Sequence, residues 1–326
     1  MLHEHALDRR HGRDTLPEEL EMVRRRAELT ALPVEQRRAV LLAPGGARRL
    51  AEAGMTWETL AGWLHGPMDA AAWAAIIPSM GYMARLRNLR NFDEADVPDE
   101  VIAPVLAQLA DPEQVRRSRQ LPFRFYSAYK SAPSLRWGHA LEQALGHAVG
   151  NIPALGGRTL VLVDTSASMQ APLSGRSSVS RVEVGALFGV AFAARTRACD
   201  LVGFANGVFT HHLRPAASVL KQTQAFTERI GEVGHGTDIP GAVRAAYAGH
   251  ERVVIVSDMQ TIGSPGRGVS DLVPAHVPIY GFNLAGYAAG AMPTGSANRH
   301  EFGGLSDATW QMMALLESGR NADWPF

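Results

Sequence analysis

The hydrophobic pattern of the chain changes about halfway along its length. From Leu16 to about Val149, apolar residues recur at spacings of three and four, alanine and leucine dominate, and runs of β-branched residues are absent. Turn residues interrupt this pattern at intervals typical of ordinary helices, at Pro44-Gly45-Gly46, Gly66-Pro67, Pro78, Pro98 and Pro122. The first half is therefore predicted to be a set of packed helices, although no clean sequence period marks superposable repeats.

A stretch rich in glycine and proline, HAVGNIPALGGR at 147–158, ends the helical half. Beyond it, short apolar runs alternate with helical stretches, and we interpret the runs as buried parallel strands: TLVLVDT (159–165), DLVGFAN (200–206), RVVIVSD (252–258) and VPIYGFN (277–283). Helices are expected at 183–198, 216–230, 239–249 and 306–318. The predicted fold class is an α-helical module over residues 1–152, followed over residues 153–326 by an α/β, Rossmann-like domain with a doubly wound, mostly parallel sheet.

Two aspartates directly follow predicted strands, where open parallel sheets bind their ligands. Asp164 opens the sequence DTSAS, so the side chains of Asp164, Ser166 and Ser168 alternate and can converge above the strand, and Asp258 follows a second strand. Oxygen donors of this kind suit Mg²⁺ or another divalent cation such as Mn²⁺. The simpler alternative is that the serines cap a helix and Asp258 merely ends a strand.

Two enzyme interpretations compete with a metal site. Phosphatases of the haloacid dehalogenase type keep a nucleophilic aspartate after a strand, but they need a second carboxylate two residues later, where this chain has Ser166, a poor proton donor. A serine hydrolase would need GxSxG at a strand-to-helix turn, and His235, the nearest base, is more simply a loop residue. We therefore expect no catalytic activity.

A basic and aromatic stretch lies between Glu113 and Glu142, which contains no acidic residue. Its basic residues are Arg116, Arg117, Arg119, Arg124, Lys130 and Arg136, and its aromatic residues are Phe123, Phe125, Tyr126, Tyr129 and Trp137. Single-stranded RNA is bound by such a combination of phosphate neutralisation and base stacking. The alternative is that the aromatic residues belong to the core and the arginines to a solvated face.

A second basic segment, MGYMARLRNLRNF at 80–92, places Arg87, Arg90 and Asn91 on one face of a predicted helix. These side chains could contact phosphates together, or could form an ordinary solvated face. The pattern of this segment favours neither interpretation over the other.

Composition limits the class of protein. The length of 326 residues and the hydrophobic content of 46% are sufficient for two packed domains, and 32 basic residues balance 32 acidic ones, so bulk charge selects no partner. The single cysteine, Cys199, fits a reducing compartment, and we expect a cytoplasmic protein. The N-terminus is charged and the longest apolar run, 184–194, is too short to span a bilayer, so no membrane partner is expected.

The DTSAS sequence resembles the metal-ion-dependent adhesion site of von Willebrand factor A domains. In that family a threonine and a second aspartate come from later loops, and Thr237 in GTDIP and Asp258 in VSDM match them. The resemblance implies one Mg²⁺ site formed by Asp164, Ser166, Ser168, Thr237 and Asp258. An open coordination position on the ion would accept an acidic side chain or a phosphate oxygen.

The segments MGYMARLRNLRNF and RRSRQLPFRFYSAYKS, followed by LVLVDTSASM and the closing GGLSDATWQMMALLESG, are similar to the Ro autoantigen family of bacterial type. Its TROVE module is a ring of HEAT-like helical repeats that binds RNA. The helical half here is about half as long as that module, so ring closure is not assumed.

This second resemblance implies a ribonucleoprotein without catalytic activity that binds small noncoding, Y-like RNA or misfolded RNA, with an exoribonuclease as a partner by analogy. The RNA-binding residues would be Arg87, Arg90, Asn91, Arg116, Arg117, Arg119, Arg124 and Lys130. The alternative function is a protein-interaction adaptor for an AAA ATPase or another partner, in which the metal ion bridges to an acidic residue of the partner.

Overall fold

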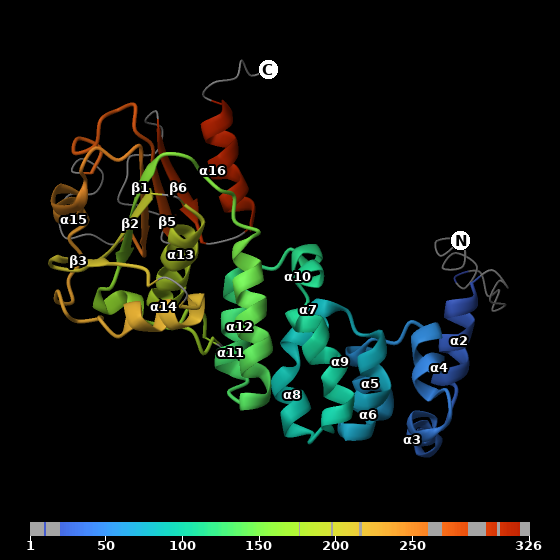
Figure 1. The fold of residues 1–326 in the computed structure, drawn as a ribbon. Coiled ribbons are helices and arrows are strands. Elements are labelled where there is room, and N and C mark those ends of the chain that lie inside the picture. Colours follow the sequence, from blue (N-terminus) through green and yellow to red (C-terminus); the bar gives the residue numbers. More distant parts are fainter. Residues whose placement is uncertain are drawn as a thin grey trace. The chain divides into compact units, whose positions relative to one another are not determined.

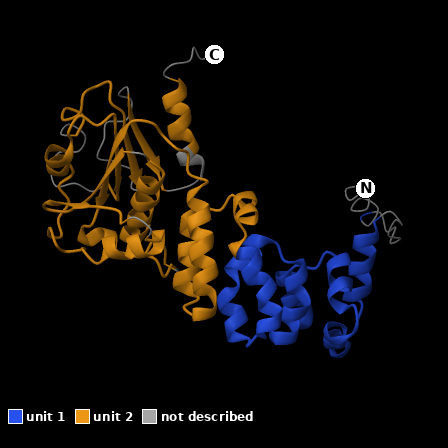
Figure 2. Ribbon diagram, viewed as in Figure 1, with its two compact units in different colours: residues 1–109 blue, residues 110–326 orange. Residues whose placement is uncertain are grey.

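The computed structural model describes residues 10, 20–175, 177–196, 198–214, 217–259, 269–285, 298–304 and 307–319. The chain forms two compact units, residues 1–109 and residues 110–326 (Figure 2). In the described part of the chain, no helix is both long and apolar enough to cross a bilayer.

The first unit is helical, and prolines or glycines stand between its helices where the sequence predicted breaks. Pro44 lies between the second and third of its helices, Gly66-Pro67 between the fourth and fifth, and Pro98 directly before the last. The elements are α2 (Glu21–Thr30), α3 (Val34–Leu42), α4 (Gly46–Glu52), α5 (Trp57–Leu64), α6 (Ala70–Ile76), the 3₁₀ turn η1 (Ile77–Ser79), α7 (Tyr82–Arg87), α8 (Leu89–Glu94) and α9 (Asp99–Ala110).

Large aromatic side chains hold the helices of the first unit together. Trp73 packs against Trp57 and, edge to face, against Phe92, at ring centroid separations of 5.9 and 5.0 Å. Trp63 is buried, and its indole N–H donates to the Leu29 carbonyl at 2.9 Å, so α5 satisfies a backbone acceptor near the end of α2.

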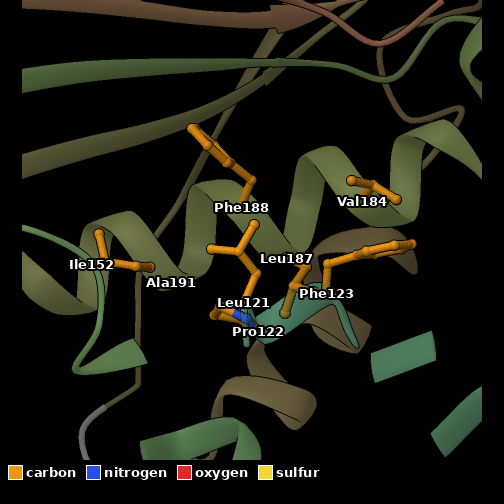
Figure 3. Close-up of a pocket in the computed structure, with 8 residues that line it drawn as sticks. All are labelled: Leu121, Pro122, Phe123, Ile152, Val184, Leu187, Phe188 and Ala191. Atoms are coloured by element: carbon orange, nitrogen blue, oxygen red, sulfur yellow. The ribbon is translucent and has the colours of Figure 1, made fainter. Parts of the chain in front are cut away.

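The second unit begins with three helices, α10 (Pro112–Ser118), α11 (Pro122–Ser131) and α12 (Leu135–Val149). Pro122, at the start of α11, packs with Leu121, Phe123 and Ile152 against one face of α13 (Arg181–Arg195), as Figure 3 shows. The contact is apolar and encloses a cavity of only about 20 Å³, roughly the space of one water molecule. Helices α11 and α12 therefore share a core with the sheet domain that follows them.

The sheet of the second unit has six strands in the order β3-β2-β1-β4-β5-β6. Figure 1 shows its strands as arrows, with α13, α14 (Val219–Thr227) and α15 (Ile239–Ala246) near them. All neighbouring pairs are parallel except β2 and β3, which are antiparallel. The strands are β1 (Arg158–Asp164), β2 (Ala198–Phe204), β3 (Val208–His211), β4 (Arg252–Ser257), β5 (Ile279–Asn283) and β6 (Arg299–Gly303). After β1, the chain adds β2 and β3 on one side of that strand, and then β4, β5 and β6 on its other side. The order of the strands therefore reverses between β1 and β4, and open parallel sheets bind ligands at such a switch point.

Helices cover both faces of this sheet. On one face, Gly185 and Gly189 of α13 lie against Val163 of β1, and a Cβ at Gly189 would lie 2.7 Å from a Leu201 methyl group, so glycine permits the close approach. On the other face, Ile239 and Val243 of α15 (Ile239–Ala246) join a core with alternate strand residues. The remaining helical elements are η2 (Ala167–Gln170), α14 (Val219–Thr227) and α16 (Asp307–Gly319).

The predicted fold class is confirmed, with two strands added. All four predicted strands are present, whereas β3 and β6 were not predicted. The expected helix bounds at Ala216 and Ser306 lie outside the described residues, as does Leu16. The helix-to-sheet transition falls between α12 and β1, inside 147–158, but the compact units divide earlier, at Leu109 and Ala110. The assignment of residues 1–152 to one functional module stays a prediction.

Candidate metal centre and nucleic-acid interface

Asp164 lies at the end of β1 and is fully buried. Its Oδ1 accepts a hydrogen bond from the Ser166 backbone N–H at 2.8 Å, and its Oδ2 accepts one from the Ser257 hydroxyl at 2.6 Å. The register pairs Val163 with Val256, so β4 brings Ser257 opposite Asp164 and Asp258 one residue further. The switch point of the sheet thus places both aspartates at one edge.

The two serines of the DTSAS sequence also meet there. The hydroxyls of Ser166 and Ser168 lie 3.2 Å apart, and Ser166 is 1% exposed. Burial raises the pKa of Asp164 to about 6, and the Asp258 carboxylate adds to the rise. Two mutually repelling carboxylates with hydroxyls beside them form a donor set that a divalent cation would stabilise.

Thr237 reaches this edge on a loop that Asn206 holds in place. The Asn206 side-chain oxygen accepts hydrogen bonds from the backbone N–H groups of His235 and Gly236, at 3.0 and 2.9 Å. The His235 carbonyl in turn accepts from the Ala167 backbone N–H at 3.0 Å, which ties the Thr237 loop to the serine loop. A Cβ at Gly236 would lie 2.6 Å from the Asn206 amide nitrogen, so this loop requires glycine.

The loop after β4 is strained beside Asp258. Met259 is 3% exposed and has a φ of 59°, a left-handed conformation that costs a residue with a side chain roughly 1 to 2 kcal/mol. Its backbone N–H donates to the Ser257 hydroxyl at 3.0 Å, and this bond helps to maintain the conformation. Strain of this kind is frequent at functional sites.

Arg181, at the start of α13, also faces the two loops. Its Nη1 lies 3.8 Å from Asp258 Oδ2 and 3.4 Å from the Ser168 carbonyl oxygen. The guanidinium therefore brings one positive charge to an edge that holds two carboxylates. Sequence reasoning did not find Arg181, Asn206 or Ser257. Ser257, next to Asp258, and Asn206, at the end of the predicted strand 200–206, carried a local signal, whereas Arg181 carried none.

The candidate metal site depends on hydroxyl oxygens as well as carboxylates. Within the described ranges, no group of three or more histidine, cysteine, aspartate or glutamate side chains is arranged to hold a metal ion. The two aspartates, two serines and one threonine leave nitrogen and sulfur out of the donor set, as Mg²⁺ prefers. The residues fit a hard divalent cation, and occupancy by one stays a prediction.

The expected RNA-binding residues of α10 and α11 differ in their surroundings. Arg116 and Arg117 are exposed and share Glu113, at 2.7 Å each, and their hydrogen bonds lower the pKa of Glu113 to about 2. Lys130 pairs with Glu183 at 2.9 Å, and Arg124 lies over the Phe123 ring at 6.0 Å. The single negative charge of Glu113 offsets only one of the two positive charges of Arg116 and Arg117, so positive charge remains at the end of α10.

Arg119 follows α10 in a left-handed conformation, with φ of 52°. Glycine is favoured at such helix ends because it has no Cβ. Arg119 therefore has a strained backbone, and because its side chain is exposed, burial of that side chain does not offset the strain.

Most of the aromatic side chains in this stretch are not free to stack on bases. Phe125 and Trp137 are 0% exposed, Tyr126 is 6% exposed, and Phe123 packs against α13 (Figure 3). Tyr129 is 37% exposed. The alternative that places the aromatic residues in the core is therefore correct for most of them, and any binding here depends on the basic residues.

The predicted residues of the 80–92 segment lie on α7 and α8 in the first unit. Arg87 and Arg90 are exposed, and Arg90 pairs with Glu94 at 3.3 Å. Asn91 is half-buried and donates to the Asn88 side chain at 2.7 Å. The structure therefore leaves the two arginines more accessible to a ligand than Asn91.

Comparison with known proteins gives two findings. The TROVE domain family model matches residues 16–137, a range that includes helices of both compact units. The crystal structure of the Deinococcus radiodurans Ro (RSR) protein has the same fold, with a TM-score of 0.71, 18% identity, and coverage of 93% of this chain and 65% of that one. The chain thus spans less than two thirds of the length of that protein.

The structure of a mutant of the PilB minor pilin from Streptococcus sanguinis also matches, over 52% of this chain and 61% of the pilin chain, at 11% identity. Its TM-score of 0.26 is too low to indicate a shared fold. No curated protein matches the chain.

Proposed function

Because the TROVE domain family model matches residues 16–137 and the chain has the fold of the Deinococcus radiodurans Ro (RSR) protein, we propose that this protein is an RNA-binding ribonucleoprotein component. The TROVE match carries the proposal. Within the matched range, exposed arginines at the end of α10 supply the positive charge that an RNA backbone requires.

Arg116, Arg117 and Arg119 are the main contacts in this proposal. Their planar guanidinium groups can bind phosphate oxygens with two hydrogen bonds each. A phosphate would compete with Glu113 for Arg116 and Arg117, an exchange between exposed ion pairs that costs little. Arg87, Arg90 and Arg124 are further phosphate contacts, whereas Lys130 and Asn91 contribute less because Glu183 and Asn88, which engage them, are themselves largely buried.

The RNA in this proposal is small, noncoding and Y-like, or misfolded, and an exoribonuclease is a partner that would act on it. Because the accessible groups among the proposed contacts are mostly cationic and few aromatic rings of the described residues are exposed, binding through the phosphate backbone and RNA shape is favoured over base reading. The protein itself is proposed to have no catalytic activity. A cytoplasmic location stays a prediction.

We further propose that Asp164, Ser166, Ser168, Thr237 and Asp258 hold Mg²⁺ or Mn²⁺ in a von Willebrand A type site. A bound ion would offer its open coordination position to an anionic oxygen, from an acidic protein ligand or a phosphate. Asp164 and Asp258 would supply the negative charge, and the support for Thr237 is that Asn206 and the Ala167 backbone hold the loop just before it. If RNA binding fails, this site supports the alternative of a protein-interaction adaptor.

The test of RNA binding replaces the three arginines at the end of α10. Fluorescence anisotropy would measure the affinity of the full chain for a labelled single-stranded RNA and for a labelled hairpin. Arg116→Glu, Arg117→Glu and Arg119→Glu together should weaken binding by at least about tenfold, because three phosphate contacts become repulsive.

The matched control carries the same change of charge elsewhere in the second unit. Arg214, Lys221 and Arg244 are exposed, and Arg214→Glu, Lys221→Glu and Arg244→Glu together should leave the affinity within about twofold. Equal losses in both triple variants would mean that net charge alone attracts RNA. Wild-type protein that binds neither RNA would refute the proposed function.

A further inference from the structure

A group of arginines that the sequence analysis did not single out surrounds a hollow in the first unit. Arg24 and Arg25 of α2 and Arg48 and Arg49 of α4 line it, together with Glu28, Glu52, Pro44 and Gly45. We call this hollow the α2–α4 cavity. Its volume is about 440 Å³, which is ample for a phosphate group and part of a ribose.

The acidic side chains around the α2–α4 cavity neutralise only part of its charge. Arg25 is ion-paired with both Glu21 and Glu52, and Arg48 lies 3.7 Å from the same Glu52. The lining has four arginines and two glutamates, and Glu21 pairs with Arg25 beside it, so one positive charge is in excess.

Arg24 and Arg49 are the uncommitted members of the group. Both are exposed, and no ion pair or hydrogen bond of either side chain is found in the described part of the chain. They face the same hollow from two different helices. A ligand with several acceptor oxygens could therefore engage both without breaking a contact of the protein.

Other arginines of the first unit are used differently. Arg26 donates to the Gly54 carbonyl, Arg37 to the carbonyls of Leu32 and Trp63, and Arg85 to the carbonyl of Ile77. These side chains satisfy backbone acceptors and so support the fold. Arg24 and Arg49 do not perform this task, and their exposed charges stay available to an anionic ligand.

We propose that the α2–α4 cavity binds a phosphodiester group of RNA through Arg24 and Arg49. The inference rests on the proposed function and adds a second contact region, because none of its residues is among those expected to bind RNA at α7, α8, α10 and α11. Guanidinium groups on two sides of a hollow suit the tetrahedral arrangement of phosphate oxygens. Glu21 and Glu52 offset the charges of Arg25 and Arg48, so the charge offered to a phosphate comes from Arg24 and Arg49.

The test uses the full chain with Arg24→Glu and Arg49→Glu, and the labelled single-stranded RNA as the probe. Two lost phosphate contacts should reduce the affinity at low salt by about tenfold or more, and should reduce the slope of log affinity against log salt by about 1.4. The control is Lys221→Glu with Arg244→Glu, which changes the charge equally and should alter neither quantity.

The outcomes separate the two claims. Wild-type protein that binds no RNA refutes the proposed function. Wild-type binding that Arg24→Glu with Arg49→Glu leaves unchanged, in affinity and in salt slope, overturns the α2–α4 cavity alone. If circular dichroism shows that the charge-reversed variant is unfolded, Arg24→Gln with Arg49→Gln replaces it. A reduction of about 1.4 in the slope of log affinity against log salt would then support the proposal, and an unchanged slope would overturn it.

Discussion

Asp164 illustrates how much of a functional site one residue's surroundings determine. Its two carboxylate oxygens are held by the Ser166 N–H and the Ser257 hydroxyl, and burial with Asp258 nearby raises its pKa to about 6. Both aspartates are 0% exposed, so their charge needs compensation from within the protein or from a bound ion. Arg181 provides part of it, at 3.8 Å from Asp258.

A titration of Mn²⁺ tests this balance of charge. Asp164→Ala should abolish binding, because it removes a carboxylate from the proposed site. Arg181→Gln should instead tighten binding by about tenfold, because the unit charge of Arg181 repels a divalent ion across several ångströms. Isothermal titration calorimetry, together with the shift of the melting temperature on adding EDTA, would measure both effects.

Lys221→Gln serves as the control, since Lys221 is an exposed residue of α14. Its affinity for Mn²⁺ should equal that of the wild-type protein. Absence of Mn²⁺ binding by the wild-type protein would refute the metal proposal, whereas equal affinity of wild-type and Arg181→Gln would refute only the effect assigned to Arg181.

At the scale of elements, the best predicted segments are those that are buried along most of their length. The buried parallel strands read as apolar runs, and Pro44, Pro98 and Pro122 marked helix boundaries. The strand β3 was missed although Asn206-Gly207 before it is a strong hairpin signal. The strand β6 has the sequence RHEFG, which carries no apolar run, so no local pattern could predict it.

Contacts between residues far apart in the sequence could not be predicted either, because no local pattern marks them. Four of the metal-site candidates could be proposed from local pattern, because DTSAS is one continuous segment and Asp258 follows a strand, whereas Thr237 came only from the resemblance to von Willebrand factor A domains. The pairing of Arg181 with Asp258, and of Glu183 with Lys130, joins residues far apart in the sequence, and nothing near either residue announces it. Packing of α10 to α12 with the sheet domain was likewise not predicted.

The attachment of α16 gives a prediction about stability. Glu317 of α16 forms an ion pair with Arg252 of β4, whose side chain is 5% exposed and also donates to the Gly156 carbonyl and the Thr159 hydroxyl. Glu317→Gln should lower the free energy of unfolding by about 3 kcal/mol, because it leaves a buried guanidinium without its counter-charge. Urea denaturation would measure the change.

Ser318→Ala on the same helix is the matched control. Its hydroxyl is exposed and donates only to the Leu315 carbonyl among the described residues, so its removal should change stability by less than about 0.5 kcal/mol. A loss for Glu317→Gln no larger than that of the control would contradict the role given to this ion pair.

At the scale of the whole molecule, function depends on where charge is placed. Basic and acidic residues balance at 32 each, so no overall field draws RNA to the protein. The TROVE match nevertheless covers every proposed RNA contact, from Arg24 in the first unit to Lys130 in the second. Binding is therefore expected to come from local clusters of arginine within a neutral protein.

The salt dependence of RNA affinity tests this account most directly. If about five phosphates are contacted, the dissociation constant of wild-type protein for single-stranded RNA should rise on the order of a hundredfold between about 50 and 200 mM salt. Affinity that stays constant across that range, or no measurable binding at the lower salt concentration, would contradict the claim that these arginines bind an RNA backbone.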